Sequence, residues 1–222
     1  MDYSEIVPVS ERELLAPTIY QPQRNGCMQL IGYGEDSYTM YVLSAEIDIL
    51  FSKLNDGCGP QNSIVLYRPC FGRKHGIGEF DFIILASNTV YLGETKLIYS
   101  GKNYNNIILK QCQIDRHDKM EKLIRLWFEL PSNERILLML EPNRFHLKLP
   151  TKNSGLYQHI ESFLSLLSSK YSSLPLVKNK LLVLSDVIDG KEFTVNTSDF
   201  DITSMRIPDP SVSVLPKYIN LR

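Results

Sequence analysis

Two runs of β-branched and aromatic residues, joined by a short polar segment, limit the possible folds of this chain more than any other feature. The runs cover residues 79–85 and 90–98, and the joint covers 86–89. Such a pattern is typical of a β-hairpin, and apolar side chains at successive positions indicate strands that are buried on both faces. The hairpin is therefore expected to lie at the centre of the core.

Charged residues interrupt this apolar hairpin. If the two ends of the joint lie opposite each other, Asp81 lies opposite Glu94, and Glu79 lies opposite Lys96. Directly opposed side chains have Cβ atoms about 4.5 to 5.5 Å apart, and like charges at that distance destabilise a sheet. Side chains at i and i+2 share a face, so Lys96 points the same way as Glu94. A register shifted by one residue would remove this pairing.

Two opposed carboxylates in a core need a compensating cation, because an unpaired buried charge costs several kcal/mol. Mg²⁺ prefers oxygen ligands, is usually held by one or two carboxylates and keeps several waters. A lysine beside it can orient or deprotonate such a water and offset negative charge in the transition state. Asp81, Glu94 and Lys96 therefore suit phosphodiester hydrolysis. A purely structural ion cluster is the alternative interpretation.

The rest of the chain alternates between helical and strand patterns. Helices are expected over residues 38–54, 107–128 and 156–171, and further buried strands over 63–67, 135–141 and 180–188. This order predicts an α/β fold with a central mixed sheet flanked by helices on both faces. A length of 222 residues favours a single domain over 1–222. Its core is expected over about 38–190, with appendages at 1–37 and 191–222.

The hairpin residues resemble the PD-(D/E)xK nuclease superfamily, which has the restriction-endonuclease-like fold. The resemblance lies in an acid on the second core strand, an E-x-K tripeptide on the third and a preceding helix with a glutamate, and it covers roughly residues 38–127. It implies that Asp81 and Glu94 bind metal and that Lys96 is the catalytic lysine. Phe80 stands where the family motif has proline.

The same resemblance implies two further site residues. Glu46, in the middle of the predicted helix 38–54, corresponds to the helical acid that often joins the metal site. The spacing looks most like the nuclease-related and RecB-like branches, whose next helix carries a glutamine near the site. Gln111 is the matching position and Gln113 is a nearby competitor. The RecB-like tyrosine partner would fall near Asp115, so that longer motif is incomplete.

Charge is unevenly distributed along the chain although the net charge is only −1. Residues 1–67 contain 3 basic and 9 acidic side chains, whereas residues 68–125 contain 10 basic and 6 acidic ones. The basic block includes a glycine-flanked loop with Arg73, Lys74 and His75, which is a candidate grip on nucleic-acid phosphates. The alternative for this loop is ordinary solvation.

Composition and cysteine spacing bear on the compartment. The sequence has neither a basic head followed by an apolar run nor about 20 consecutive apolar residues, so neither a signal peptide nor a membrane span is expected. The cysteines form no Cys-x-x-Cys pair, which argues against a zinc knuckle or a thioredoxin-type motif. We expect reduced thiols and a cytoplasmic protein.

The sequence thus predicts an enzyme, a metal-dependent deoxyribonuclease that uses Mg²⁺ and accepts Mn²⁺ in its place. Its expected partner is DNA, and two biological settings fit. One is a restriction-type endonuclease that works as a homodimer, so that two sites reach both strands. The other is a repair or defence nuclease. The alternative from a different class is a catalytically silent nucleic-acid-binding module, or a complex subunit, of the same fold.

Overall fold

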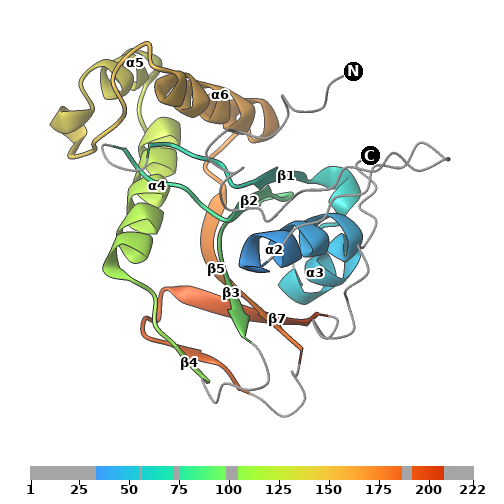
Figure 1. The fold of residues 1–222 in the computed structure, drawn as a ribbon. Helices are drawn as coiled ribbons and strands as arrows, with labels where there is room; N and C mark the ends of the chain where they lie inside the picture. The colour runs from blue at the N-terminus through green and yellow to red at the C-terminus, as the bar shows by residue number, and fades with distance from the viewer. Residues whose placement is uncertain (1–33, 56, 73–75, 99–104, 187–191, 208–222) are drawn as a thin grey trace, which may run out of the picture.

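A five-stranded mixed sheet forms the centre of the molecule (Figure 1). The computed structural model describes residues 34–55, 57–72, 76–98, 105–186 and 192–207. Strand order is β1-β2-β3-β5-β7; the first three strands pair antiparallel, and β3, β5 and β7 pair parallel. The strands are β1 (Ile64–Tyr67), β2 (Phe82–Leu85), β3 (Thr89–Ile98), β5 (Leu176–Ser185) and β7 (Phe200–Arg206).

Helices cover both faces of this sheet, which confirms the predicted α/β class. Figure 1 shows α4, α5 and α6 on one side and α2 and α3 on the other. The period-2 alternation of β2 and β3 divides their apolar side chains between the two layers. Ile83 and Leu92 pack toward α4 and α6, whereas Ile84 and Tyr91 pack toward α2 and α3. The helices are α2 (Gly34–Ala45), α3 (Ile47–Leu54), α4 (Gln111–Glu129), α5 (Ser132–Leu140) and α6 (Gly155–Lys170), with short 3-10 turns at Pro60–Asn62 and Pro142–Phe145.

The central hairpin has the predicted register. Phe82 pairs with Gly93 and Leu85 pairs with Val90, and the backbone N–H of Ala86 donates to the carbonyl of Thr89 at 2.8 Å. All four β2 side chains are buried, as are the β3 side chains up to position 95. The polar joint at 86–89 therefore sets the strand pairing, and burial on both faces keeps it.

Three of the predicted elements differ from the observed ones. Residues 135–141 are predicted as a buried strand, but 135–140 belong to helix α5 and Glu141 is its C-cap. A short apolar run has no decisive period, and here Leu138 and Met139 are buried while Ile136 and Leu140 are exposed, which is a helical distribution. The expected helix 38–54 is two helices, because Glu46 leaves the helical conformation with φ −116° and ψ 20°.

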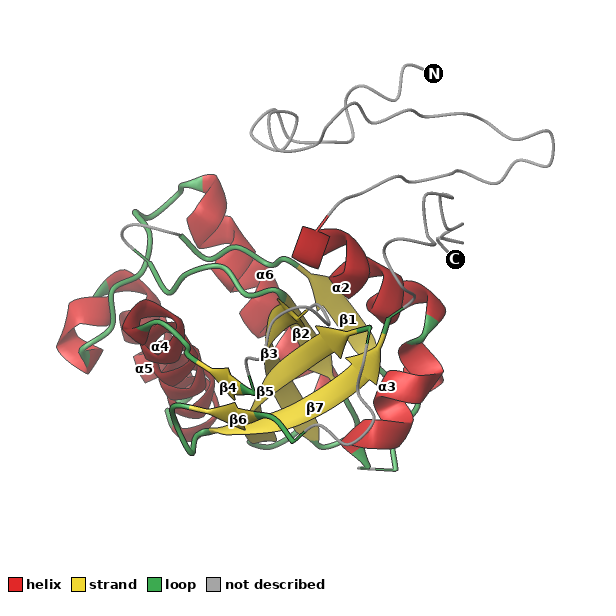
Figure 2. Cartoon of the chain, turned by 60° about the horizontal axis from the view of Figure 1, so that its bottom comes forward, coloured by secondary structure: helices red, strands yellow, loops and turns green. Residues whose placement is uncertain are grey.

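The third difference concerns the end of the core. The expected core stopped near residue 190, but β7 lies beyond it and pairs with β5 at the edge of the sheet. A second, two-stranded parallel sheet lies beside β7 in Figure 2 and consists of β4 (Asn106–Ile107) and β6 (Thr194–Val195). Part of the predicted C-terminal appendage thus belongs to the core.

Gly93 gives the first testable prediction. A Cβ atom added to Gly93 would overlap the ring of Phe82, which is 1% exposed and packed in the core. We expect Gly93→Ala to lower the free energy of unfolding by about 1–3 kcal/mol, because the ring must move in a close-packed layer. Urea denaturation checks this. Gly155→Ala is the control, since no atom of the described residues lies within 4 Å of a Cβ added there; equal losses in both variants would contradict the prediction.

Among the described residues, no helix is both long enough and apolar enough to cross a membrane.

Candidate functional site

The site predicted from sequence lies where β3 extends past the start of β2. Beyond Gly93, the N–H groups of Thr95 and Leu97 that face β2 have no strand partner in the described part of the chain, and a backbone N–H in a core needs an acceptor. Asp81 Oδ2 accepts from Thr95 N at 2.7 Å, and Glu35 Oε2 accepts from Leu97 N at 3.0 Å. Two carboxylates therefore take the place of the missing strand.

Asp81 is the first residue outside the ladder of the hairpin. Its N–H donates to the carbonyl of Gly93 at 3.1 Å. This bond holds the Asp81 backbone next to Glu94, the residue that follows Gly93. Burial, and next the charge of Glu94, raise the pKa of the Asp81 carboxyl to about 7, with Glu35 adding to the effect. The bond from Thr95 and the charge of Lys96 act in the opposite direction but do not outweigh them. Asp81 is thus a carboxylate short of positive charge.

Glu94 is completely buried and has three side-chain partners, all on α4. Gln113 Nε2 donates to Glu94 Oε2 at 2.7 Å, Arg116 Nη2 forms an ion pair with the same oxygen, and His117 Nε2 lies 3.1 Å from Oε1. Burial opposes ionisation of Glu94, but the hydrogen bond with His117 and the charge of Arg116 outweigh it. The pKa of Glu94 therefore lies below its usual value.

His117 connects Glu94 on β3 to the neighbouring strand β5. The imidazole has no exposed surface, and its Nδ1 lies 2.9 Å from Oδ1 of Asn179 on β5. Phe80 and Phe200 pack against it, with ring centroids 4.9 and 4.5 Å away. This position fixes the ring and, through it, the orientation of the Glu94 carboxylate.

Lys96 lies at the exposed end of the same strand. Its Nζ donates to Thr95 O at 2.7 Å and lies 3.3 Å from Glu35 Oε1, and its side chain is 28% exposed. The predicted register places Glu79 opposite Lys96. Glu79 instead accepts a hydrogen bond from Arg68 at 2.6 Å, so the predicted pair is wrong. Lys96 therefore keeps contact with solvent.

The structure brings some of the predicted residues together and not others. Asp81, Glu94 and Lys96 share the end of the hairpin. Glu46 accepts from Tyr41 at 2.6 Å, and burial together with this bond raises the pKa of Tyr41 to about 12. Helix α2 instead supplies Glu35, the acid bonded to Lys96 and coupled to Asp81.

The helix α4 glutamine also differs from the expected one. Gln111 is exposed and donates to Asp115 at 2.9 Å, whereas Gln113 reaches Glu94. The predicted phosphate loop, with Arg73, Lys74 and His75, lies outside the described residues.

Several residues of the site were not predicted from the sequence, and Gln113 was named only as a competitor of Gln111. Gln113, Arg116 and His117 have the spacing i, i+3, i+4, which places them on one helix face, and this signal could have identified them. Glu35 and Asn179 carry no local signal, because they reach the site only through the packing of α2 and β5.

Metal-ligating side chains are few at this site. Within the described parts of the chain, no group of three or more His, Cys, Asp or Glu side chains is arranged to hold a metal ion. A cation at the hairpin would therefore rest on Asp81 and Glu94, with water completing its ligands.

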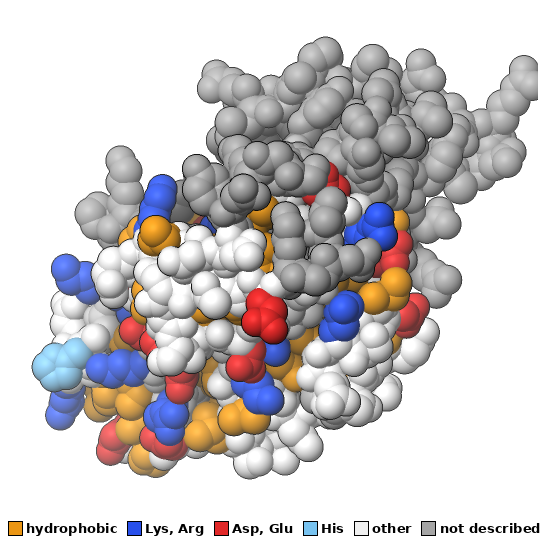
Figure 3. All heavy atoms as spheres, turned by 90° about the horizontal axis from the view of Figure 1, so that it is seen from below, with side chains coloured by type: hydrophobic (Ala, Val, Ile, Leu, Met, Phe, Trp, Pro, Cys, Tyr) orange, Lys and Arg blue, Asp and Glu red, His pale blue; other side chains and the backbone are white. Residues whose placement is uncertain are grey.

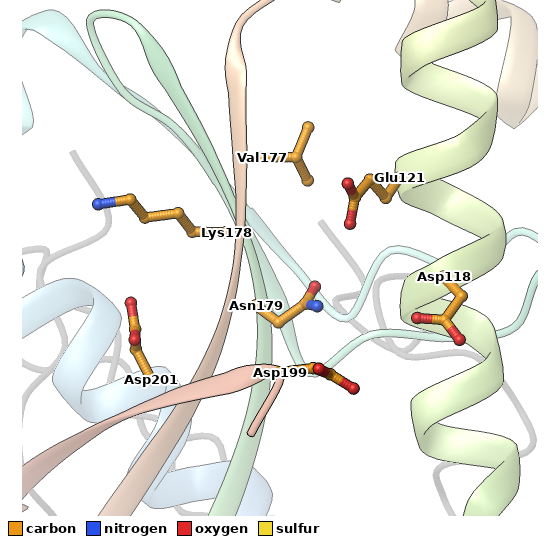
Figure 4. Close-up of a pocket in the computed structure, with 7 residues that line it drawn as sticks. All are labelled: Asp118, Glu121, Val177, Lys178, Asn179, Asp199 and Asp201. Carbon is orange, nitrogen blue, oxygen red and sulfur yellow. The ribbon is translucent and has the colours of Figure 1, made fainter. Parts of the chain in front are cut away.

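A surface hollow of about 470 Å³ is lined in part by Asn179, the partner of His117 (Figure 4). Figure 4 shows Asn179 and Asp199 facing Asp118 and Glu121 on α4. Burial, and next the charge of Asp199, raise the pKa of Asp118. Such an acidic hollow repels a phosphate backbone. Figure 3 shows that basic and acidic side chains are interspersed on the face seen from below. The lining residues are Asp118, Glu121, Val177, Lys178, Asn179, Asp199 and Asp201.

The charge deficit at Asp81 predicts a pH-dependent stability. Its pKa of about 7 in the folded protein exceeds the value of about 4 in an unfolded chain. Between these two pH values, folding therefore either makes the Asp81 carboxylate take up a proton or leaves it ionised in an unfavourable environment. Stability then falls as pH rises from about 4 to 7. In EDTA at pH 8 we expect Asp81→Asn to be more stable than the wild type by about 1–3 kcal/mol, with no difference near pH 4.

Urea denaturation at both pH values measures this difference. Asp48→Asn is the control, because Asp48 is an exposed carboxylate on α3, and its effect should stay within about 0.5 kcal/mol at either pH. An Asp81→Asn variant that is less stable than the wild type at pH 8 would contradict the prediction.

Comparisons of the chain with protein-family models, with curated proteins and with solved structures find no match.

Proposed function

We propose that this chain is a metal-dependent nuclease that hydrolyses phosphodiester bonds of DNA. One observation carries the proposal: at the end of a buried hairpin, Asp81 accepts from the N–H next to Glu94, and burial together with the charge of Glu94 leaves Asp81 short of the positive charge that would keep it ionised. A cation shared by the two carboxylates would supply that charge. The resemblance to PD-(D/E)xK nucleases rests on the same residues.

The side chains present fit Mg²⁺. The donors are hard carboxylate oxygens, and Mg²⁺ is usually held by one or two of them with several waters. An ionised carboxylate offers about four acceptor positions, and Gln113, Arg116 and His117 occupy three of those on Glu94. Among the described residues, a position on Oε1 therefore stays open. Glu35 takes the place proposed for Glu46 as the acid supplied by the helical region, and it bonds Lys96.

The proposed mechanism assigns a separate task to each residue of the chain. A bound Mg²⁺ would supply Lewis acidity and a more acidic water. Lys96, with its ammonium at the solvent end of the strand, orients the attacking water and offsets negative charge on the phosphorane-like transition state. Glu35 holds that ammonium in place. His117 keeps the Glu94 carboxylate in one orientation from inside the core.

DNA as substrate and the biological setting are further parts of the proposal. The basic block over residues 68–125, which contains Lys96 and Arg116, favours a phosphate backbone over a neutral substrate. A reducing, cytoplasmic compartment is consistent with Cys58, Cys70 and Cys112, which form no disulfide within the described part of the chain. Both a homodimeric restriction endonuclease and a repair or defence nuclease remain within the proposal.

A specific observation favours the second candidate, a catalytically silent nucleic-acid-binding module. Both oxygens of Glu94 have protein partners, and Lys96 is bonded to Glu35 and Thr95. Each of these charged groups therefore has a partner of opposite charge or a hydrogen-bond partner without a metal. The charge deficit at Asp81 argues for the nuclease, because a silent module has no use for it.

Cleavage of DNA tests the proposal directly. The purified full chain is incubated with long duplex and single-stranded DNA in Mg²⁺, in Mn²⁺ and in EDTA, beside Asp81→Asn. We expect cleavage only with metal and only by the wild type, because Asp81→Asn removes a ligand charge. Discrete duplex fragments would favour the restriction setting, and smears or single-strand preference the repair setting. DNA binding without cleavage under every condition would favour the silent module.

A further inference from the structure

Arg116 is held against Glu94 by its surroundings. Its side chain passes over Gly78, where an added Cβ would lie 3.0 Å from Arg116 Cδ, and its guanidinium lies 5.8 Å from the centre of the Phe80 ring. From there Nη2 reaches Glu94 Oε2. The guanidinium is thus the side-chain cation that neutralises this fully buried carboxylate at close range, with His117 on the other oxygen.

The hydrogen bonding of Arg116 is incomplete in this position. A guanidinium carries five N–H donors, yet Nε of Arg116 is buried and has no hydrogen-bond partner among the residues that the structure describes. The interaction with Glu94 therefore neutralises the charge of the guanidinium but does not supply acceptors for all of its N–H groups. An arrangement of this kind is easier to exchange for another than a fully bonded one.

The two partners on Glu94 differ in their freedom to move. His117 has no exposed surface and is fixed by Asn179 and two aromatic rings, whereas the Arg116 side chain is 18% exposed. A divalent cation on Glu94 would lie within a few ångströms of the guanidinium, where like charges repel strongly. Of the two, only Arg116 has access to solvent when that repulsion arises.

We propose that Arg116 is the counter-cation of Glu94 in the metal-free protein and competes with the divalent cation for this carboxylate. The guanidinium keeps Glu94 ionised and oriented until metal binds, and the metal then displaces it. Arg116 therefore lowers the metal affinity of the site. This inference rests on the proposed function, because it requires that Glu94 binds metal.

Binding of Mn²⁺, measured by isothermal titration calorimetry without DNA, tests the competition. Arg116→Gln removes the charge and keeps an amide donor for Glu94, and we expect it to bind Mn²⁺ about tenfold more tightly than the wild type. Arg125→Gln is the matched control, since Arg125 is 55% exposed on the same helix and bonded to Glu121. Its affinity should stay within about twofold of the wild type, because exposed charges beyond about 10 Å are screened.

Each result has a distinct meaning. Equal or weaker Mn²⁺ binding by Arg116→Gln, with the wild type binding normally, would overturn the competition and leave the proposed function intact. No Mn²⁺ binding by either protein would overturn the metal-dependent function, and the competition with it. Tighter binding by Arg116→Gln that Asp81→Asn abolishes would support both.

A measurement on the wild type covers the case in which Arg116→Gln does not fold. In a ¹H–¹⁵N spectrum, the Arg116 Nε–H signal is identified by its absence from Arg116→Lys. Titration with Mg²⁺ should shift this signal as the guanidinium leaves Glu94. A signal that stays unchanged while the backbone signals of Glu94 shift to saturation would overturn the proposal.

Discussion

Replacing Lys96 by alanine is expected to lower the rate of metal-dependent DNA cleavage by about 10²–10⁴-fold, the usual effect of removing a group that transfers or orients a proton. Lys96 has a partly exposed ammonium beside Asp81 and Glu94, so it can act on a water at the phosphate. Its ion pair with Glu35 is partly solvated, so the loss of stability should stay below about 1 kcal/mol. Single-turnover cleavage of an end-labelled duplex measures the rate.

The control for this variant is Lys53→Ala. Lys53 is an exposed lysine in the last turn of α3, and its removal should leave the cleavage rate unchanged within about twofold. Thermal unfolding of each variant verifies that the fold persists. A Lys96→Ala protein that remains folded and cleaves DNA at the wild-type rate would exclude Lys96 from the chemistry.

Replacing His117 by alanine is expected to lower the free energy of unfolding by about 3–5 kcal/mol, because it removes a hydrogen-bonding partner from a fully buried carboxylate. His117 lies between Glu94 and Asn179, so both lose a contact. The change also leaves a cavity between Phe80 and Phe200. Urea denaturation at pH 7 gives the free energy of unfolding directly.

His159→Ala provides the comparison. His159 is exposed on α6, where its ring lies 3.3 Å from the carbonyl of Cys70. Its replacement should change stability by no more than about 0.5 kcal/mol. If His117→Ala proved as mild as His159→Ala, the buried contacts of His117 would contribute little, and Glu94 would be held mainly by Arg116 and Gln113.

The hairpin shows how far local sequence carries a structural prediction. Apolar residues on both faces of two short runs, with a polar joint between them, were sufficient for the strands and their register. The same register placed the acid pair and Lys96 at one end of the hairpin. Hairpin pairing depends on neighbours in sequence, so a one-dimensional pattern contains the required information.

The sequence predictions were wrong for a short apolar run and for the acidic residue that the helical region contributes to the site. The apolar run at 135–141 has no decisive period, and its helical form follows from packing against α4 and α6. The sequence analysis assigned the helical acid to Glu46, which lies between α2 and α3, and did not consider Glu35 in the first turn of α2. Because α2 packs against β3, Glu35 is the acid that reaches the site, where it accepts a hydrogen bond from the N–H of Leu97.

The sequence alone determined the α/β class, the central hairpin and the cluster of Asp81, Glu94 and Lys96, because these depend on burial and on period-2 alternation along neighbouring strands. Only the tertiary structure decided the partners of the cluster. Gln113, Arg116 and His117 meet Glu94 because α4 crosses the sheet at that point, and Asn179 joins them from β5. Glu94, this face of α4 and Asn179 are far apart in sequence, and long-range packing alone brings them together.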